Sequence, residues 1–432
     1  MTPDLAQFTV FAHKNPSMKF NSLMGLIFRV EGLRESFRRL PGNKAAGSDG
    51  IKKDDYHKDL ENNLATLSDR VRRGGYTPKP VLRVYIPKSS GSGRRPLGIP
   101  AFEDRIVQDR IAGVLQAIWE PEFLDCSFGF RPGRNAHQAI RVIDKAIMKE
   151  RVNYVVEADI KGFFNHVDHN WLLKFLAHRI KDERLIQTIR KFFQGEIMED
   201  GSVRSSDEGT PQGGLISPCL SNIYLHYVLD LWFDRLFRKS CKGTARFVRY
   251  CDDYVAMFEF EEDAKRFMAE MTSRLQKFAL EVEPTKTKLL AFGIKEFRTA
   301  QKVSRHMATF SFLGFTHYMR KNRRGYPMVD RKTDAARLRR KAKEMSAQLA
   351  KRRTLGIKLM VGFACSHFRG HLQYYGISGN LRSLKRYRQL VRLYLFKWIN
   401  RRSQRRSLTW EKVTLLINSF ELAEPRVIHA IW

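Results

Sequence analysis

The sequence predicts an α+β fold in which an antiparallel sheet is followed by an all-helical, strongly basic C-terminal region. Residues 247–258 form two short apolar runs around a polar centre, the pattern of a β-hairpin with Asp252 and Asp253 at its tip. A β-branched strand that ends at Asp159 is expected to pair antiparallel with this hairpin. Residues 331–432 carry 24 Lys and Arg against 5 Asp and Glu, largely in segments with helical periodicity.

The composition points to a polyanionic partner. The chain has 432 residues and a formal net charge of +33, and such an excess on a foldable composition favours nucleic acid. A basic ribosomal-type protein or a membrane-surface protein is the alternative. No apolar run reaches the roughly 18 residues that a membrane span needs, so we expect no membrane association. The five cysteines are scattered, which predicts neither a disulfide framework nor a zinc site.

The neighbouring carboxylates are the first candidate for chemistry. Asp252 and Asp253 repel each other and resist desolvation, so a counter-charge is expected beside them. Mg²⁺ prefers carboxylate oxygen and water as ligands. An ordinary Asx turn between two strands would explain the pair equally well. The third carboxylate, Asp159 on the adjoining strand, favours the metal reading, because such a set can hold two metal ions for in-line phosphoryl transfer.

These residues and several longer strings resemble a known family. Asp159 with the run Tyr-Cys-Asp252-Asp253 resembles the palm of a reverse transcriptase. The surrounding motifs resemble those of group II intron-encoded proteins, in the same order along the chain, at 127–137, 208–223, 310–315 and 367–380. The resemblance implies a right-hand polymerase, with fingers and an antiparallel palm sheet followed by an all-helical thumb, the maturase domain X.

The same resemblance divides the chain into three parts. Residues 1–50 correspond to a helical N-terminal extension, 51–330 to the fingers and palm, and 331–432 to the basic thumb. It also implies a location in the bacterial cytoplasm, where association with the nucleoid is compatible with the charge.

The resemblance assigns roles to individual residues. It implies two Mg²⁺ ions, for which Mn²⁺ can substitute. The catalytic and metal-binding positions are Asp159, Asp252 and Asp253, with Ile160 as a further metal position. The nucleotide-binding positions are Lys88, Arg95, Phe164, Gln212 and Lys286. The template- and primer-binding positions are Arg131, Arg134, Gly213, Tyr250, Cys251, Leu313 and Gly314.

Two of these roles have simpler alternatives. Lys88 and Arg95 flank a Gly-Ser tip and would place cations against a triphosphate, but a basic hairpin can also bind a nucleic-acid backbone. Phe164 matches the aromatic that excludes a 2′-OH by a clash, but it could equally be plain core packing. The chain also departs from the family at Asn165, usually Asp, and at Glu283, usually Asn.

The predicted function is RNA-directed DNA polymerisation with RNA template, a DNA or RNA primer and dNTPs as partners. A structured intron RNA is a further expected partner, and a homodimer is compatible with the sequence. One alternative is a splicing maturase in which polymerisation is secondary. Another is a nucleic-acid-binding protein with an inactive palm, which the complete set of acids disfavours. Because Cys251 replaces the usual alanine of the family, we also consider a domesticated enzyme serving DNA repair or phage defence.

Overall fold

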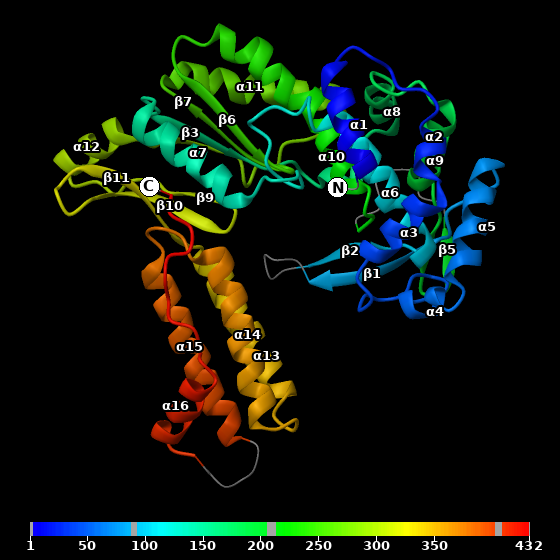
Figure 1. Cartoon of the computed structure of the whole chain (residues 1–432). Coiled ribbons are helices and arrows are strands. Elements are labelled where there is room, and N and C mark those ends of the chain that lie inside the picture. The colour runs from blue at the N-terminus through cyan, green and yellow to red at the C-terminus, as the bar shows by residue number, and fades with distance from the viewer. Residues whose placement is uncertain (1–2, 88–92, 205–212, 402–407, 432) are drawn as a thin grey trace.

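The computed structural model describes residues 3–87, 93–204, 213–401 and 408–431. It is a mixed α+β structure with three sheets, and four C-terminal helices project from the body of the molecule (Figure 1). The predicted positions Lys88 and Gln212 lie outside the described residues, as does the side chain of Arg95.

The N-terminal part is helical and packs around one buried helix. Helix α6 is buried along most of its length because apolar residues occupy several of its faces, so α1 and α3 can cover it from different sides. The bounds are α1 Pro3–Lys14, α2 Leu23–Ile27, α3 Val30–Arg39, α4 Lys53–His57, α5 Leu60–Arg72 and α6 Phe102–Trp119.

The first sheet has the order β2-β1-β4-β5 and contains the predicted basic hairpin. The antiparallel pairing of β1 with β2 confirms the two strands expected around the Gly-Ser tip. Strand β4 pairs with β1 in parallel, which the sequence did not suggest. The bounds are β1 Val81–Pro87, β2 Arg94–Ile99, β4 Ile197–Glu199 and β5 Ser202–Arg204.

The central sheet has the order β6-β7-β3-β8 and is antiparallel throughout, as predicted. Helices α11 and α7 flank the central sheet (Figure 1). Alternate residues of β7 face opposite cores: Tyr254, Ala256 and Phe258 share a core with α11, whereas Val255 and Met257 share one with α7. Burial of both faces explains the unbroken apolar run in this strand. The bounds are β3 Tyr154–Ala158, β6 Ala245–Tyr250, β7 Asp253–Phe258, β8 Lys288–Ala291, α7 Ala136–Lys149 and α11 Glu261–Lys277.

Shorter helices surround the central sheet, and a third sheet, β11-β10-β9, adjoins it. The helical bounds are η1 Phe163–Asn165, α8 His169–Leu176, α9 Glu183–Phe193, α10 Ser217–Leu225, η2 His226–Asp230, η3 Phe233–Phe237, η4 Arg238–Ser240 and α12 Ile294–Lys302. The strands are β9 Phe310–Phe312, β10 Phe315–Lys321 and β11 Pro327–Thr333.

The C-terminal helices have their own hydrophobic core. On the third of them, apolar residues at helical spacing form a buried stripe, and Leu384, Tyr387, Val391 and Leu395 are fully buried. The chain then returns to the body, where the carbonyl of Ala430 accepts a 2.7 Å hydrogen bond from Arg141 of α7. The bounds are α13 Ala335–Lys351, α14 Ile357–Tyr375, α15 Leu381–Asn400 and α16 Trp410–Ser419. Among the described residues, no helix combines the length and apolar composition needed to cross a membrane.

Candidate active site

The three predicted carboxylates lie at one end of the central sheet. Tyr250 pairs with Asp253 across a two-residue turn, so Asp252 sits at the tip between β6 and β7. Ala158 is the register partner of Tyr254 on the next strand. Asp159 follows Ala158 directly and therefore lies beside Asp253. Residues 94 positions apart in the chain are brought together by strand pairing alone.

A cleft of about 920 Å³ opens over this end of the sheet. Its walls come from the central sheet, from the β9–β10 turn and from the first turns of α13. Asp159 and Asp253 line it, whereas Asp252 is half-buried at the hairpin tip. The other lining residues that matter below are Ile160, Lys286, Leu313, Gly314, Arg337 and Arg340.

The cleft is lined by as many basic as acidic side chains, but Asp252 and Asp253 meet at a partly desolvated part of it. Desolvation by the surrounding protein raises the pKa of Asp253 to about 7, and the charges of Asp252 and Asp159 add to the effect. Burial also raises the pKa of Asp252. Among the described residues, Asp159 alone of the three carboxylates forms a salt bridge, with the ammonium of Lys286. The charges of Arg337 and Lys286 lower the pKa of Asp253 but do not cancel the effect of burial.

The donor chemistry of this site fits a hard divalent cation. Carboxylate oxygens are the ligands that Mg²⁺ prefers. Desolvation, with a smaller contribution from the neighbouring carboxylates, raises the pKa values of Asp252 and Asp253, and a bound cation would favour their ionised forms. Within the described parts of the chain, however, no three His, Cys, Asp or Glu side chains are already grouped as a metal site. Binding would require the Asp159 carboxylate to turn from Lys286 toward its neighbours.

A buried ion pair holds the hairpin from behind. The guanidinium of Arg249 is completely buried and donates to both carboxylate oxygens of Asp230, at 2.7 and 2.5 Å. It also donates to the carbonyl of Cys251 at 3.0 Å, to Asn222 and to Ser127. Four of these hydrogen bonds fix the Arg249 side chain, and the fifth, to the Cys251 carbonyl, holds the turn that carries the two aspartates. This network was not predicted from the sequence, although a charged residue inside an apolar strand run was a usable signal.

The hairpin tip also packs directly on a loop backbone. Cys251 is buried and has a φ of +61°, which is uncommon for a residue with a side chain. A Cβ on Gly129 would lie 2.4 Å from the Cys251 sulfur and 2.6 Å from its backbone nitrogen. Asn222 donates a 2.7 Å hydrogen bond to the Gly129 carbonyl and closes the contact. Glycine is therefore required at position 129.

Replacing Gly129 with alanine is expected to impair catalysis more than folding. The added methyl meets backbone, which cannot move aside as a flexible side chain can, so the hairpin tip must shift. A misplacement of about 1 Å at a reacting centre can cost on the order of 100-fold in rate. Single-nucleotide addition and thermal melting would be measured together. The control is Gly25→Ala, where nothing lies within 4 Å of the added methyl; equal activity of the two variants would contradict the expectation.

The predicted primer-binding turn is a tight hairpin. Leu313 and Gly314 connect β9 to β10 and both have positive φ, +51° and +82°, as a two-residue hairpin turn requires. The Leu313 carbonyl accepts a 2.8 Å hydrogen bond from Tyr374 of α14. A Cβ on Gly314 would lie 2.9 Å from the guanidinium of Arg337. The turn thus connects the cleft to the C-terminal helices.

The structure buries one predicted template-binding residue. Arg131 was expected to present its charge to a template, but its side chain is buried. Its guanidinium donates to the Glu120 carboxylate at 2.8 Å and to the carbonyls of Leu124 and Ser127. A guanidinium engaged in this way organises its own loop. Arg134, by contrast, lies at the surface, where it pairs with the exposed Asp125.

Of the remaining predicted residues, Ile160 lines the cleft, whereas Phe164 and Gly213 are not among its lining residues. Phe164 is half-buried and meets Phe163 edge to face at 5.3 Å between ring centroids. Ile160 is buried and bridges to Val282. Gly213, with a φ of +121°, lies against strand β2, since a Cβ there would be 2.2 Å from the Gly98 carbonyl.

The structure adds a cation that the sequence did not single out. Arg337 lies in the first turn of α13, lines the cleft and lowers the pKa of Asp253 by its charge. It also hydrogen-bonds Tyr375. In the sequence it was one of many basic residues in a helical segment, so nothing distinguished it.

Comparison with known proteins identifies the family. Residues 86–317 match the family model described as reverse transcriptase (RNA-dependent DNA polymerase). Protein YkfC of Escherichia coli (strain K12) is 38% identical over 247 residues, which cover 56% of this chain and 63% of that protein. The group II intron-encoded protein LtrA of Lactococcus lactis subsp. cremoris is 36% identical over 230 residues, 52% of this chain and 38% of LtrA.

A third relative reaches into the C-terminal helices. The uncharacterized 91 kDa protein in the cob intron of Schizosaccharomyces pombe is 28% identical over 404 residues, 80% of this chain and 49% of that protein. The matches thus span 38% to 63% of the length of these relatives. The family model covers more than half of the chain and includes all three carboxylates. The chain therefore belongs to the reverse transcriptase family, and its relatives confirm the resemblance to group II intron-encoded proteins.

Proposed function

We propose that this protein is an RNA-directed DNA polymerase that extends a primer with dNTPs on an RNA template. The observation that carries the proposal is the meeting of Asp159 with Asp252 and Asp253 at one end of an antiparallel sheet, inside the family match. In this reading the central sheet is the palm, the β1–β2 hairpin belongs to the fingers and α13–α16 form the thumb.

The three aspartates are the residues that would hold two divalent cations, Mg²⁺ by preference, with Ile160 beside them. When bound, such ions supply the charge that activates a primer 3′-OH and stabilises the pyrophosphate leaving group. The chain holds the hairpin that carries Asp252 and Asp253 in a fixed position, because Arg249 and Gly129 contact it from two sides. The ammonium of Lys286 pairs with Asp159 in this structure. Once a cation binds Asp159, Lys286 would be able to turn toward the nucleotide phosphates.

The walls of the cleft would position the other reactants. The Leu313–Gly314 turn brings backbone close to where a primer terminus would lie, and the neighbouring Arg337 offers a cation to its phosphates. Phe164 would exclude a 2′-OH by contact with the sugar. Lys88, Arg95 and Gln212 complete the proposed nucleotide site.

DNA synthesis at subsaturating Mg²⁺ is expected to fall as pH decreases through 7. Asp253 must be ionised to bind a cation, and its pKa of about 7 means that protons compete with the metal below that pH. The apparent Mg²⁺ affinity should therefore drop up to about tenfold per pH unit below 7. Initial rates across a pH series would show the fall, and excess Mg²⁺ should restore the rate at about pH 6. A rate independent of pH at limiting metal would contradict this expectation.

The proposed function is tested by extension of a DNA primer on RNA and on DNA templates, with dNTPs or rNTPs supplied in parallel. We expect extension with dNTPs only. The variant Phe164→Val removes the aromatic ring and should admit rNTPs while retaining dNTP incorporation. Failure of the wild-type chain to extend on either template would overturn the proposal. Unchanged sugar selectivity in the variant would overturn only the role of Phe164.

A splicing maturase is the second candidate function, because the exposed faces of the C-terminal helices are strongly basic. Arg382, Lys385 and Arg386 of α15 are all exposed, and residues 331–432 have far more cations than carboxylates. Such a surface would be self-repelling without phosphates. Tight binding of a structured intron RNA, with splicing stimulated by an Asp252→Ala variant that cannot polymerise, would favour this function.

A further inference from the structure

A second cavity, of about 640 Å³, lies at the opposite end of the central sheet from the carboxylates. Tyr154, the first residue of β3, lines it, whereas Asp159 follows the last residue of that strand. At about 3.3 Å per residue the two ends are roughly 16 Å apart. The cavity is therefore separate from the proposed active site, and the proposed chemistry does not use it.

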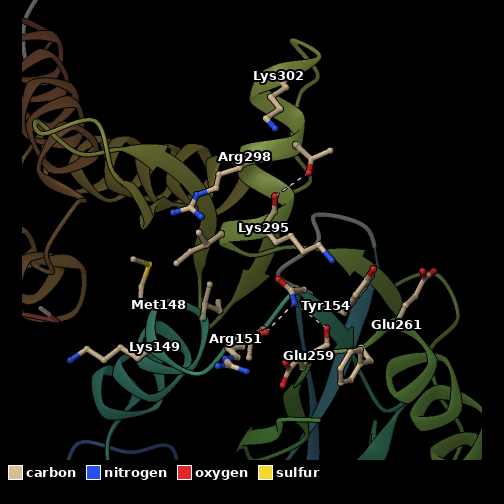
Figure 2. Close-up of a pocket in the computed structure, with 15 residues that line it drawn as sticks. Met148, Lys149, Arg151, Tyr154, Glu259, Glu261, Lys295, Arg298 and Lys302 are labelled. Atoms are coloured by element: carbon tan, nitrogen blue, oxygen red, sulfur yellow. Dashed lines mark hydrogen bonds between the residues drawn. The ribbon is translucent and has the colours of Figure 1, made fainter. Parts of the chain in front are cut away.

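Cations from two sides surround this cavity. Lys295, Arg298 and Lys302 come from α12, and Lys149 and Arg151 come from the end of α7 and the segment after it (Figure 2). All five side chains are exposed. In the described part of the chain, none of them forms a salt bridge with a carboxylate.

The two carboxylates at the cavity do not neutralise these cations. Glu261 pairs with Lys265, one turn further along α11, at 2.8 Å. Glu259 accepts a 3.1 Å hydrogen bond from the backbone amide of Thr244. The cavity thus carries an excess of positive charge that lacks an internal counter-ion, although acidic side chains are within the same region.

The spacing of the cations suits a chain of phosphates better than a single one. Lys295, Arg298 and Lys302 are three and seven positions apart on α12, so they share one face and extend over about 10 Å. The opposite face of the helix, with Phe297 and Ala300, is buried. A single small anion could not contact the whole row, whereas successive phosphates of one strand could.

An exposed aromatic ring completes the surface. Phe260 also lines the cavity and is 44% exposed, which is unusual for a phenylalanine. The half-buried ring of Tyr154 lies in the same wall. Aromatic rings beside a basic groove are the combination with which proteins bind single-stranded nucleic acid, through base stacking and phosphate pairing.

We infer that this cavity is an accessory binding site for single-stranded nucleic acid, separate from the polymerase cleft. The row on α12 contacts successive phosphates, Arg151 and Lys149 hold the strand from the facing side, and Phe260 stacks on a base. Such a site would hold a single-stranded region of a bound nucleic acid while the cleft holds the primer terminus.

The test is binding of labelled single-stranded RNA and single-stranded DNA by the full chain across a salt series. The variant Lys295→Gln/Arg298→Gln/Lys302→Gln removes three contacts, so the slope of log affinity against log salt should decrease in magnitude by about 2. With the affinity at 1 M salt unchanged, that change in slope corresponds to roughly 100-fold weaker binding near 0.1 M salt. The matched control Lys239→Gln/Lys242→Gln/Lys277→Gln removes the same charge from exposed positions outside the cavity and should leave the slope near that of the wild type.

Two further measurements separate this site from the polymerase. The α12 variant should extend a short primer–template at the wild-type rate, which also shows that it is folded. Phe260→Ala should weaken single-strand binding about fivefold or more through lost stacking. Weaker binding of these variants to single-stranded RNA alone, or to both RNA and DNA, supports the site. The pattern also shows whether the site accepts ribose alone or deoxyribose as well. A wild-type slope in the α12 variant, or an equal loss in the control, would overturn the inference.

Discussion

An Asp253→Asn variant is expected to lose DNA synthesis and to become more stable than the wild-type chain. The amide keeps the shape of the side chain but cannot supply the anionic oxygen that a divalent cation needs, so we expect a rate loss of at least about 1,000-fold. The same change removes the negative charge of Asp253, which disfavours the folded state because the surrounding protein raises the pKa of this carboxyl. Substitutions that relieve such strain at active sites commonly raise stability. Because Asp253 is exposed to solvent in the cleft, water screens its charge and the gain should be small.

The pH dependence of this gain has a definite sign. The pKa of Asp253 is about 7 in the folded protein and about 3.9 in an unfolded chain. Between these values the folded state binds more protons, so the wild-type protein loses stability as pH rises from 4 to 7. The difference in Tm between variant and wild type should therefore be largest above pH 7 and vanish near pH 4. Added Mg²⁺ should raise the Tm of the wild type but much less that of the variant.

The control for this experiment is Asp69→Asn. Asp69 is an exposed carboxylate on α5, remote from the cleft, so the same charge is removed without effect on synthesis or on the pH profile of melting. If Asp253→Asn melted below the wild type at pH 8, the uncompensated charge in the cleft would not be the strain that we describe.

An Arg249→Met variant is expected to be the most destabilising single change near the site. It leaves the Asp230 carboxylate fully buried without its partner, and breaking a buried pair from one side typically costs about 3–5 kcal/mol. Asn222 and the Cys251 carbonyl also lose their donor. Thermal melting and yield of soluble protein would measure the loss.

A double variant separates charge from packing. Arg249→Met with Asp230→Leu removes both charges and should regain much of the lost stability, because apolar side chains of similar volume can replace a buried pair. Activity should not return, since nothing then holds the turn at Cys251. The control Arg134→Met breaks an exposed pair with Asp125 and should cost less than about 1 kcal/mol. Equal stability of Arg249→Met and this control would contradict the account.

The parts of the site that local patterns encode could be predicted from the sequence. The hairpin at 247–258 and the strand before Asp159 are regular alternations of residue type around conspicuous acids, and their pairing is confirmed. The stripe on α15 is likewise a matter of helical period. Strand alternation and helical periodicity depend on residues close together in the chain, so they can be recognised directly in the sequence.

The parts that depend on tertiary contacts could not be predicted. Arg131 was read as a template contact because its loop is rich in arginine and aromatic residues, and only the fold shows that Glu120 and backbone carbonyls engage it. Gly129 meets Cys251 from a segment more than 100 residues away. Arg337 enters the cleft because of how α13 leaves the third sheet. No local pattern distinguishes Arg131 or Arg337 from the other arginines near them in the chain.

The measurement that tests the central claim most directly is single-nucleotide addition to a DNA primer on an RNA template, with the wild-type chain and an Asp252→Ala variant side by side in Mg²⁺. Binding of the primer–template is measured in the same samples. We predict dNTP addition by the wild type, no detectable addition by the variant and similar binding by both. Addition by the variant at a rate near that of the wild type would contradict the assignment of the carboxylates as the catalytic centre.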